Sequence, residues 1–403
     1  MSFQHGLSGL NASARNLDVI GNNVANAQTV GAKSSRAEFA DLYANSLTGL
    51  STATSGIGVA VTGVAQQFTQ GDIVSTNNPL DMAINGRGFF RVADEGAVQY
   101  TRNGQFHMDK EGYIVTAQGA RLTGFPVDAS GQTSNGTPTE LRISTADLSP
   151  KATANARAQM NLDAREAAKT NVFDANDPNT YNNAMSMSVY DSLGRDHLVT
   201  LYFRKTAGNT WQVHGAADGT VVAGPAATLN FNTSGAMTSP AGPFNLTIPV
   251  GADAGGNQTF GINLTSATQF GAPFGTTEIS QDGFGTGRLS GFTADDTGML
   301  IGRYSNGQTR PQGQITLANF VNPQGLVPLG NNVWVEGSES GQPTLGSPGT
   351  GILGSLEAGA VENSNVDLTA ELVNMITAQR AYQANAQTIK THDQMLQTIV
   401  NLR

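Results

Sequence analysis

The sequence lacks cysteine, and it is short of charge and of long apolar runs. With no cysteine among its 403 residues, disulfides, thiolate metal ligands and a thiol nucleophile are excluded. Only 13% of the residues are charged and the net charge is −9, which argues against a nucleic-acid partner. No run of about 18 apolar residues occurs, so we expect no membrane insertion. The start, MSFQHGLSGLNASARNL, also lacks the basic and apolar regions of a cleavable secretory signal.

The segment Gly31-Ala32-Lys33-Ser34 raises the question of a phosphate-binding loop. A Walker A loop needs lysine directly after its second glycine, so that the amine reaches the phosphates of the nucleotide. Here Ala32 intervenes, and Asn26 stands where the first glycine is required. The segment therefore fails the pattern on both counts.

Other catalytic and cofactor signatures are missing as well. The GxG of Gly86 and Gly88 has Arg91 in place of a third glycine, so a dinucleotide fold is not predicted. The sequence has no GxSxG elbow and no HExxH, and its five histidines show no metal-ligand spacing. Two acidic pairs precede glycines and are typical of hairpin turns: Asp109/Glu111 and Asp295/Asp296. We therefore expect no enzyme activity, no cofactor and no metal.

The N-terminus has the period of an amphipathic helix from about residue 3 to 24. Its apolar stripe follows alternating steps of four and three residues: Phe3, Leu7, Leu10, Ala14, Leu17, Gly21 and Val24. Glycines 6, 9 and 21 each cost roughly 1 kcal/mol relative to alanine in a helix interior. The predicted helix is therefore weak alone and needs a partner.

The C-terminus carries the clearest periodic signal, since 360–403 contains neither glycine nor proline. We predict one helix from about 367 to 401, capped by Asp367 or by Asn365. A heptad seam runs along it for more than four repeats: Leu368, Leu372, Met375, Gln379, Tyr382, Ala386, Ile389, Asp393, Leu396 and Val400.

Strand and turn signals dominate between the two ends. Residues 156–164 alternate apolar and polar with a period of two, which predicts a strand. Hairpins are predicted where glycine stands with Asp, Asn or Ser between strand-like flanks: 106–115, 189–203 and 228–240. The tract 215–280 has few large apolar residues, and we expect small β-structure with long loops there. YTRNGQ at 100–105 is echoed by YSNGQ at 304–308, either as two hairpin turns or as parts of one domain around a central insert.

At both ends the sequence resembles the rod and hook family of bacterial flagellar axial proteins. LDVIGNNVANAQTVGAKSSRAEF (17–39) is similar to that family's loop signature at Asn22, Asn23, Asn26, Thr29 and Gly31, and 364–403 is a closer match still. LDMAINGRGFFRV (80–92) and YTRNGQF add support. Chain length and the large insert favour the hook subunits over the shorter rod subunits. One departure is Ala32, where the family usually has an aromatic residue.

The resemblance implies a mainly β fold with helical termini paired as a coiled-coil-like inner domain. We expect that domain at 1–70 plus 360–403, a β-rich middle domain at 71–144 plus 285–359, and an outer β-domain at 145–284 inserted in the middle one. The two helical stripes would then pack between subunits. The polar seam residues Gln379 and Asp393 would either fix register through specific partners or face a solvated lumen.

The same resemblance implies a structural role rather than a chemical one. Hook subunits form a flexible curved tube of many copies that transmits torque from rod to filament. The implied partners are the flagellar rod, the hook cap, the hook-filament junction proteins and the type III export apparatus. The implied location is the extracellular hook attached to the basal body, reached without a cleavable signal peptide. Three alternatives stay open: a distal rod or other axial component, a secreted β-rich adhesin or fibre protein, and an enzyme whose site no sequence pattern reveals.

Overall fold

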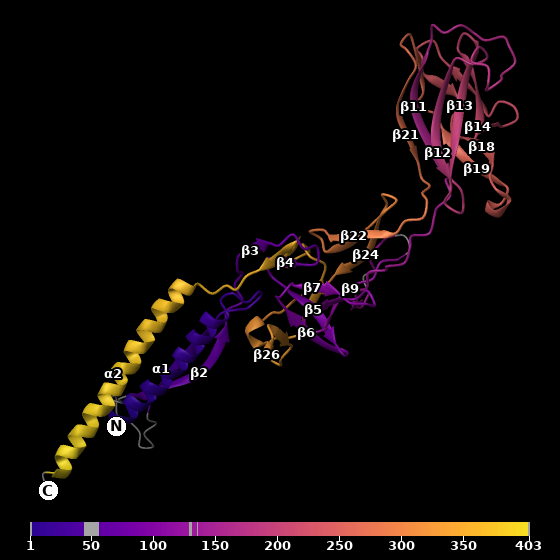
Figure 1. Cartoon of the computed structure of the whole chain (residues 1–403). Helices are drawn as coiled ribbons and strands as arrows, with labels where there is room; N and C mark the ends of the chain where they lie inside the picture. Colours follow the sequence, from indigo (N-terminus) through magenta and orange to yellow (C-terminus); the bar gives the residue numbers. More distant parts are fainter. Residues whose placement is uncertain (1, 44–55, 129–130, 135, 402–403) are drawn as a thin grey trace. The chain divides into compact units, whose positions relative to one another are not determined.

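The computed structural model describes residues 2–43, 56–128, 131–134 and 136–401, and the chain divides into two compact units. The first unit comprises Met1–Thr145, Gly291–Arg303 and Thr309–Arg403. The second comprises Ala146–Ser290 and Tyr304–Gln308. The fold is mainly β with one long helix near each end of the chain (Figure 1). The finer division into three domains stays a prediction.

Both terminal helices form where the periodic patterns predict them. Helix α1 spans Ser2–Ala25 and α2 spans Leu368–Asn401. Asp367 is the N-cap of α2, because the backbone N–H groups of Thr369 and Ala370 donate to its Oδ1 at 2.8 and 3.2 Å.

An antiparallel two-stranded ribbon of β1 (Ser35–Tyr43) and β2 (Gly56–Gln66) lies along α1 (Figure 1). Its register shifts at Glu38/Phe39 and again at Leu42/Tyr43. Two side chains of α1 hold β2: His5 Nε2 lies 2.7 Å from the Gly56 carbonyl oxygen, and the Val59 N–H donates to Ser8 Oγ at 3.3 Å. A ribbon of two strands is marginal alone, so α1 is its main support within the chain.

Thirteen strands of the described residues form the largest sheet, most of it in the first unit. Its main path is β22 (Leu289–Ala294), β23 (Met299–Tyr304), β24 (Thr309–Ile315), β9 (Arg121–Phe125), β5 (Phe89–Asp94), β6 (Ala97–Thr101), β27 (Val333–Val335) and β26 (Val327–Gly330). The strands off this path are β7 (Phe106–Met108), β8 (Ile114–Thr116), β10 (Thr139–Glu140), β25 (Leu317–Asn319) and β28 (Thr344–Gly346). Edge-to-face aromatic contacts join Phe68, Phe89, Phe320 and Trp334 in one apolar cluster. The short 3₁₀ turn η2 (Pro323–Gly325) precedes β26.

Two short antiparallel ladders fix the segment that enters α2. Strand β4 (Met82–Asn85) pairs with β29 (Ser355–Ala358), and β3 (Ile73–Ser75) pairs with β30 (Ala360–Glu362). Because β30 ends shortly before Asp367, these ladders place the start of α2 against the N-terminal part of the chain.

The second unit packs two sheets around one apolar core. One sheet contains β18 (Phe244–Pro249), β19 (Asn257–Asn263), β11 (Asn155–Asp163), β20 (Thr268–Phe270) and β21 (Gly275–Gln281). The other contains β12 (Asn183–Tyr190), β13 (Asp196–Ala207), β14 (Thr210–Ala217), β15 (Thr220–Val221), β16 (Ala227–Phe231) and β17 (Met237–Ser239). Inward-facing residues of both sheets, among them Met160, Phe203 and Trp211, form one buried cluster. The predicted strand at 156–164 and the three predicted hairpins are confirmed.

The expectation of small β-structure at 215–280 is confirmed, but the expectation of long loops there is wrong, because the strands follow one another closely. This tract contains the six complete strands β15 to β20, most of β21, the end of β14 and the turn η1 (Ala252–Ala254). Its few apolar residues alternate along the strands and point inward, so that Leu246, Ile248, Phe260 and Ile262 are almost completely buried. Spacing, rather than the number of apolar residues, anchors the tract.

Candidate functional site

The contact between α1 and α2 depends on small residues of α1. A Cβ built at Gly9 would lie 2.9 Å from Asn385 Nδ2, and one built at Gly6 would lie 2.9 Å from Ile389 Cγ1. Asn385 Nδ2 also donates to Ser13 Oγ at 3.4 Å. The glycines that weaken α1 as an isolated helix therefore allow α2 to approach it closely.

The two helices run in opposite directions, side by side (Figure 1). At the end of the pair away from Gly6 and Ile389, Asn23 Nδ2 donates to Glu371 Oε1 at 3.1 Å. Asn23 lies late in α1 and Glu371 early in α2, which fixes the antiparallel direction.

The predicted stripes are divided between this contact and the surface. Half-buried members are Leu10, Ala14, Leu17, Val24, Met375, Ala386 and Ile389. Exposed members are Leu7, Leu368, Leu372, Gln379, Tyr382, Asp393 and Leu396. The side chains of Phe3 and Val400 lie outside the described ones. Sequence reasoning missed three buried positions between the stripes, Ala12, Ile20 and Ala378. A role of the stripes in packing between subunits stays a prediction.

The signature loop closes on the protein's own backbone. The Ser35 N–H donates to Asn23 Oδ1 at 2.8 Å, and Asn23 Nδ2 donates to the Ser35 carbonyl at 2.7 Å. Asn26 Nδ2 donates to the Asn22 carbonyl at 3.0 Å, and Thr29 Oγ1 donates to Asn26 Oδ1 at 3.4 Å. The asparagines thus fasten the end of α1 to the start of β1.

Gly31 occupies a position that only glycine fits. Its φ is +71°, and a Cβ there would lie 2.5 Å from the backbone nitrogen of Asn103. Its N–H donates to the Glu362 carbonyl at 2.8 Å. The loop therefore meets both the YTRNGQ segment and the strand that leads into α2.

Lys33, Arg102 and Glu362 form a buried ion cluster directly beside this glycine. Lys33 Nζ lies 2.6 Å from Glu362 Oε1, and Arg102 Nη1 lies 3.0 Å from Glu362 Oε2. The side chains of Lys33 and Glu362 are fully buried, and that of Arg102 is 4% exposed. The Gly71 N–H donates to Glu362 Oε1 at 2.9 Å, and Lys33 Nζ also donates to the Thr69 carbonyl at 2.7 Å. The amine in the apparent phosphate motif is thus engaged inside the protein.

Burial and charge act in opposite directions on the two cations. Desolvation lowers the pKa of the Lys33 amine, and the Glu362 carboxylate opposes this shift. Desolvation likewise lowers the pKa of the Arg102 guanidinium, again opposed by Glu362. The carboxylate therefore offsets part of the cost of burying both cations.

Asn365 is a second link between the chain ends. The Ser34 N–H donates to its Oδ1 at 2.7 Å, while its Nδ2 donates to the Gln67 carbonyl at 2.7 Å and to Thr69 Oγ1 at 2.8 Å. Sequence reasoning offered Asn365 as a cap of α2 and overlooked Arg102 and Glu362. The signal for the cluster was a charged residue inside two motif segments, Lys33 and Arg102, and a third, Glu362, just before the C-terminal one.

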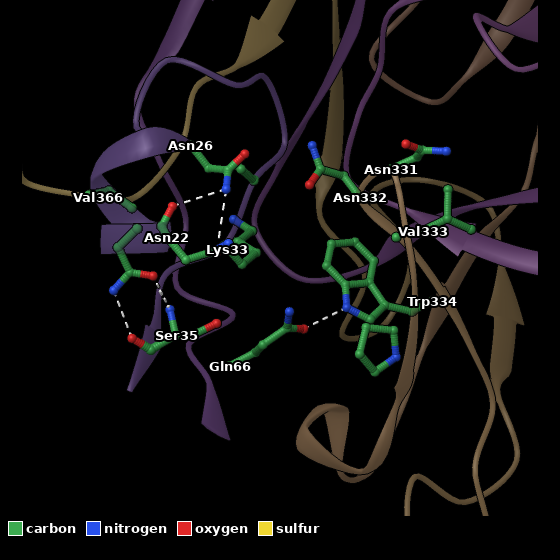
Figure 2. Close-up of a pocket in the computed structure, with 14 residues that line it drawn as sticks. Asn22, Asn26, Lys33, Ser35, Gln66, Asn331, Asn332, Val333, Trp334 and Val366 are labelled. Atoms are coloured by element: carbon green, nitrogen blue, oxygen red, sulfur yellow. Dashed lines mark hydrogen bonds between the residues drawn. The ribbon is translucent and has the colours of Figure 1, made fainter. Parts of the chain in front are cut away.

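A cavity of about 300 Å³ lies beside Ala32 (Figure 2). Asn22 and Asn26 line one side, and Asn331–Trp334 line the other. Gln66 also lines the cavity, and Trp334 Nε1 donates to its Oε1 at 2.6 Å. Ala32 is only 4% exposed, so the residue that departs from the family pattern faces space that a larger side chain could fill.

The described residues contain no group of three or more His, Cys, Asp or Glu side chains that could hold a metal ion. Among the same residues, neither helix combines the length and the apolar character that a bilayer crossing requires.

Comparison with known proteins covers almost the whole chain. Four family models match: "Flagella basal body rod protein" at 3–33, "Flagellar hook protein FlgE/F/G D1 domain" at 83–157, "Flagellar basal body protein FlaE D2 domain" at 161–284, and "Flagellar basal body rod FlgEFG protein C-terminal" at 357–402. The chain is 44% identical to the flagellar hook protein FlgE of Escherichia coli (strain K12), with both chains covered completely. The chain belongs to the flagellar hook protein family.

Other hook proteins agree with this assignment. The Borreliella burgdorferi hook protein is 34% identical over all of this chain and 99% of its own length. The crystal structure of the Helicobacter pylori flagellar hook protein FlgE2 is 14% identical, and it covers 70% of this chain and 99% of its own with a TM-score of 0.52, which supports the fold. Members of the family are structural subunits of the flagellar hook rather than enzymes, so the chain is a hook subunit.

Proposed function

We propose that the chain assembles through its terminal helices into the flexible tube of the flagellar hook, which transmits torque from the rod to the filament. In this proposal α1 and α2 pair as a coiled-coil-like inner domain. The β-rich parts stack outside it, with 145–284 inserted in the middle domain, and their wet, shallow contacts allow the tube to bend as it rotates.

The apolar surface that α2 exposes in the single chain carries this proposal. Its large exposed apolar side chains are Leu368, Leu372, Val373, Ile376, Tyr382, Met395 and Leu396. Full burial of one such side chain is worth roughly 1.5–3 kcal/mol. A soluble monomer gains nothing from this exposure, whereas packing against other copies would recover it.

The proposed partners follow from the family. They are further copies of this chain, the rod at one end, the cap and the hook-filament junction proteins at the other, and the type III export apparatus during delivery. The proposed location is the extracellular part of the flagellum, reached without cleavage of a signal peptide. Folding of the chain ends is then coupled to assembly outside the cell.

Substitution of aspartate for an apolar residue of α2 tests the proposal. Purified Leu396→Asp and Ile389→Asp chains are compared with the unsubstituted chain by electron microscopy. Loss of tubes in both variants is expected, with the β-rich parts still folded by circular dichroism. Val172→Asp is the control, because Val172 is 88% exposed and lies in the second unit. Normal tubes from both helix variants would show that the terminal helices do not drive assembly.

A further inference from the structure

A groove runs between α1, β1 and the first turns of α2, with a volume of about 520 Å³. We call it the helix groove. It is lined by Asn16, Val19, Ile20, Asn23, Ser34, Ser35, Arg36, Ala37, Phe39, Gln67, Glu371, Asn374, Thr377, Ala378 and Ala381. An apolar cavity of about 150 Å³ already holds a benzene-sized group, so the helix groove has room for two or three aliphatic side chains.

The opposite side of α2 carries an apolar row of Leu372, Val373 and Ile376. Their exposed fractions are 50%, 58% and 51%. With 3.6 residues per turn, successive side chains are about 100° apart. Leu372 and Ile376 therefore point roughly away from Ala378 and Ala381, which face the helix groove, and Val373 lies at the edge of the row that is nearer to Ala381.

We propose that the apolar row of one copy docks in the helix groove of a second copy. This contact would be the one through which the polymer of the proposed function grows. The inference rests on that proposed function, because it assumes that copies assemble through their terminal helices.

The positions of the two surfaces favour a second copy as the occupant. They lie on opposite sides of one helix, so a chain cannot place its own row in its own groove. Contact between two different patches is heterologous, and when its rotation does not close a ring it repeats without limit and generates a helical polymer. The geometry of α2 thus suits an open-ended assembly better than a closed dimer.

The helix groove also continues the contact between α1 and α2. Ala378, which is 5% exposed, and Glu371, which accepts a hydrogen bond from Asn23, belong to both. A docked row would therefore lie directly beside Ala378 and beside a contact between the helices that already exists.

Disulfide trapping between copies tests this contact, since the chain has no cysteine of its own. Full-length Ile376→Cys and Asn16→Cys chains are mixed in equal amounts, polymerised and oxidised. A bond forms only where two Cα atoms approach within about 7 Å. The expected result is a cross-linked dimer with one chain of each kind, identified by mass spectrometry. A chain carrying both substitutions should give a ladder of cross-linked multimers.

Two controls make the result specific. Neither single variant should form dimers when polymerised alone. Val172→Cys replaces Ile376→Cys in a matched mixture with Asn16→Cys, and cross-links there should stay at background. If either variant fails to polymerise, Leu372→Cys with Val19→Cys gives a second row-and-groove pair for the same test.

The outcomes separate this inference from the proposed function. Dimers of Ile376→Cys with itself would mean that two rows face each other, and would overturn the heterologous contact. Polymers without cross-links above the Val172→Cys background in both pairs would also overturn it, while assembly through the helices would stand. Failure of the unsubstituted chain to polymerise at all would refute both.

Discussion

Lys33 Nζ lies 2.6 Å from Glu362 Oε1, and neither side chain is exposed. Lys33 follows the loop that ends α1, and Glu362 closes β30, a few residues before α2 begins. Arg102, which lies in the β-rich part of the first unit, binds the other carboxylate oxygen of Glu362 at a distance of 3.0 Å. The buried carboxylate of Glu362 therefore links three parts of the first unit: the segment after α1, the segment before α2, and the β-rich part that contains Arg102.

Replacement of Glu362 by glutamine should destabilise the first unit strongly. Two buried cations would lose their counter-charge, and breaking a buried ion pair in this way costs about 3–5 kcal/mol. Urea unfolding followed by tryptophan fluorescence measures the loss. Glu357→Gln, at an exposed position of the neighbouring strand β29, should change the free energy of unfolding by less than about 0.5 kcal/mol. Equal stabilities of the two variants would contradict the structural role of the cluster.

Local patterns predicted the elements well but not the contacts between distant ones. The heptad period and the absence of glycine and proline located α2, and Asp367 is its cap. The pairing of Lys33 with Glu362 spans 329 positions, and no periodic signal links residues so far apart. In the same way, the apolar stripe of α1 indicated a buried face. That Asn385 packs against Gly9, however, depends on how α2 lies against α1. A sequence pattern shows which side of a helix is buried, and the partner decides which residue does the packing.

Substitution at Gly31 should separate backbone strain from steric clash. Gly31 and Gly349 have nearly the same φ, +71° and +74°, so alanine at either position pays a left-handed penalty of about 1–2 kcal/mol. At Gly31 the new Cβ would also lie 2.5 Å from the Asn103 nitrogen, whereas nothing lies within 4 Å at Gly349. Gly31→Ala should therefore be clearly less stable than Gly349→Ala in urea unfolding. Equal losses of unfolding free energy in the two variants would show that the loop around Gly31 shifts to accommodate the added methyl group.

Leucine at two glycines of α1 should have opposite effects. In an isolated helix each replacement gains about 0.8–1 kcal/mol of helix propensity. A Cβ added at Gly21 would meet no atom within 4 Å, but one added at Gly9 would lie 2.9 Å from the Asn385 amide. Gly21→Leu should raise the urea midpoint of the helical far-UV circular dichroism signal. Gly9→Leu should lower it, because overpacking costs typically about 1–3 kcal/mol. A rise for both would place Gly9 outside the helix contact.

An aromatic residue at position 32 should be tolerated because the neighbouring cavity of about 300 Å³ can receive the ring. Ala32→Phe is expected to unfold at the same urea concentration as the unsubstituted chain or at a higher one. Ala318→Phe is the matched control, since Ala318 is fully buried among Phe89, Phe320 and Trp334. It should lose roughly 1–3 kcal/mol by overpacking. Similar losses in the two variants would show that the cavity cannot accommodate the ring.

His197 should make the stability of the second unit depend on pH. Burial lowers the pKa of its imidazole, but the hydrogen bonds to Asp218 and Asp191 outweigh burial and the net pKa is raised above 6.5. Nδ1 lies 2.7 Å from Asp218 Oδ2, and Nε2 lies 3.4 Å from Asp191 Oδ2. Arg195, the nearby cation, also binds Asp191, with Nε at 2.8 Å from the same oxygen.

The sign of the effect follows from the raised pKa. The folded state binds the imidazole proton more tightly than the unfolded state, so the protonated pairing stabilises the fold fully below pH 6.5. This contribution is lost as the pH rises through the raised pKa. Unfolding free energies of the unsubstituted chain and of His197→Gln, measured from about pH 5 to 9, should therefore differ most at the acidic end and converge as the pH increases. Asp218→Asn should lower the pKa of His197 in an NMR titration. A difference between the two chains that grows with pH would reverse the assignment.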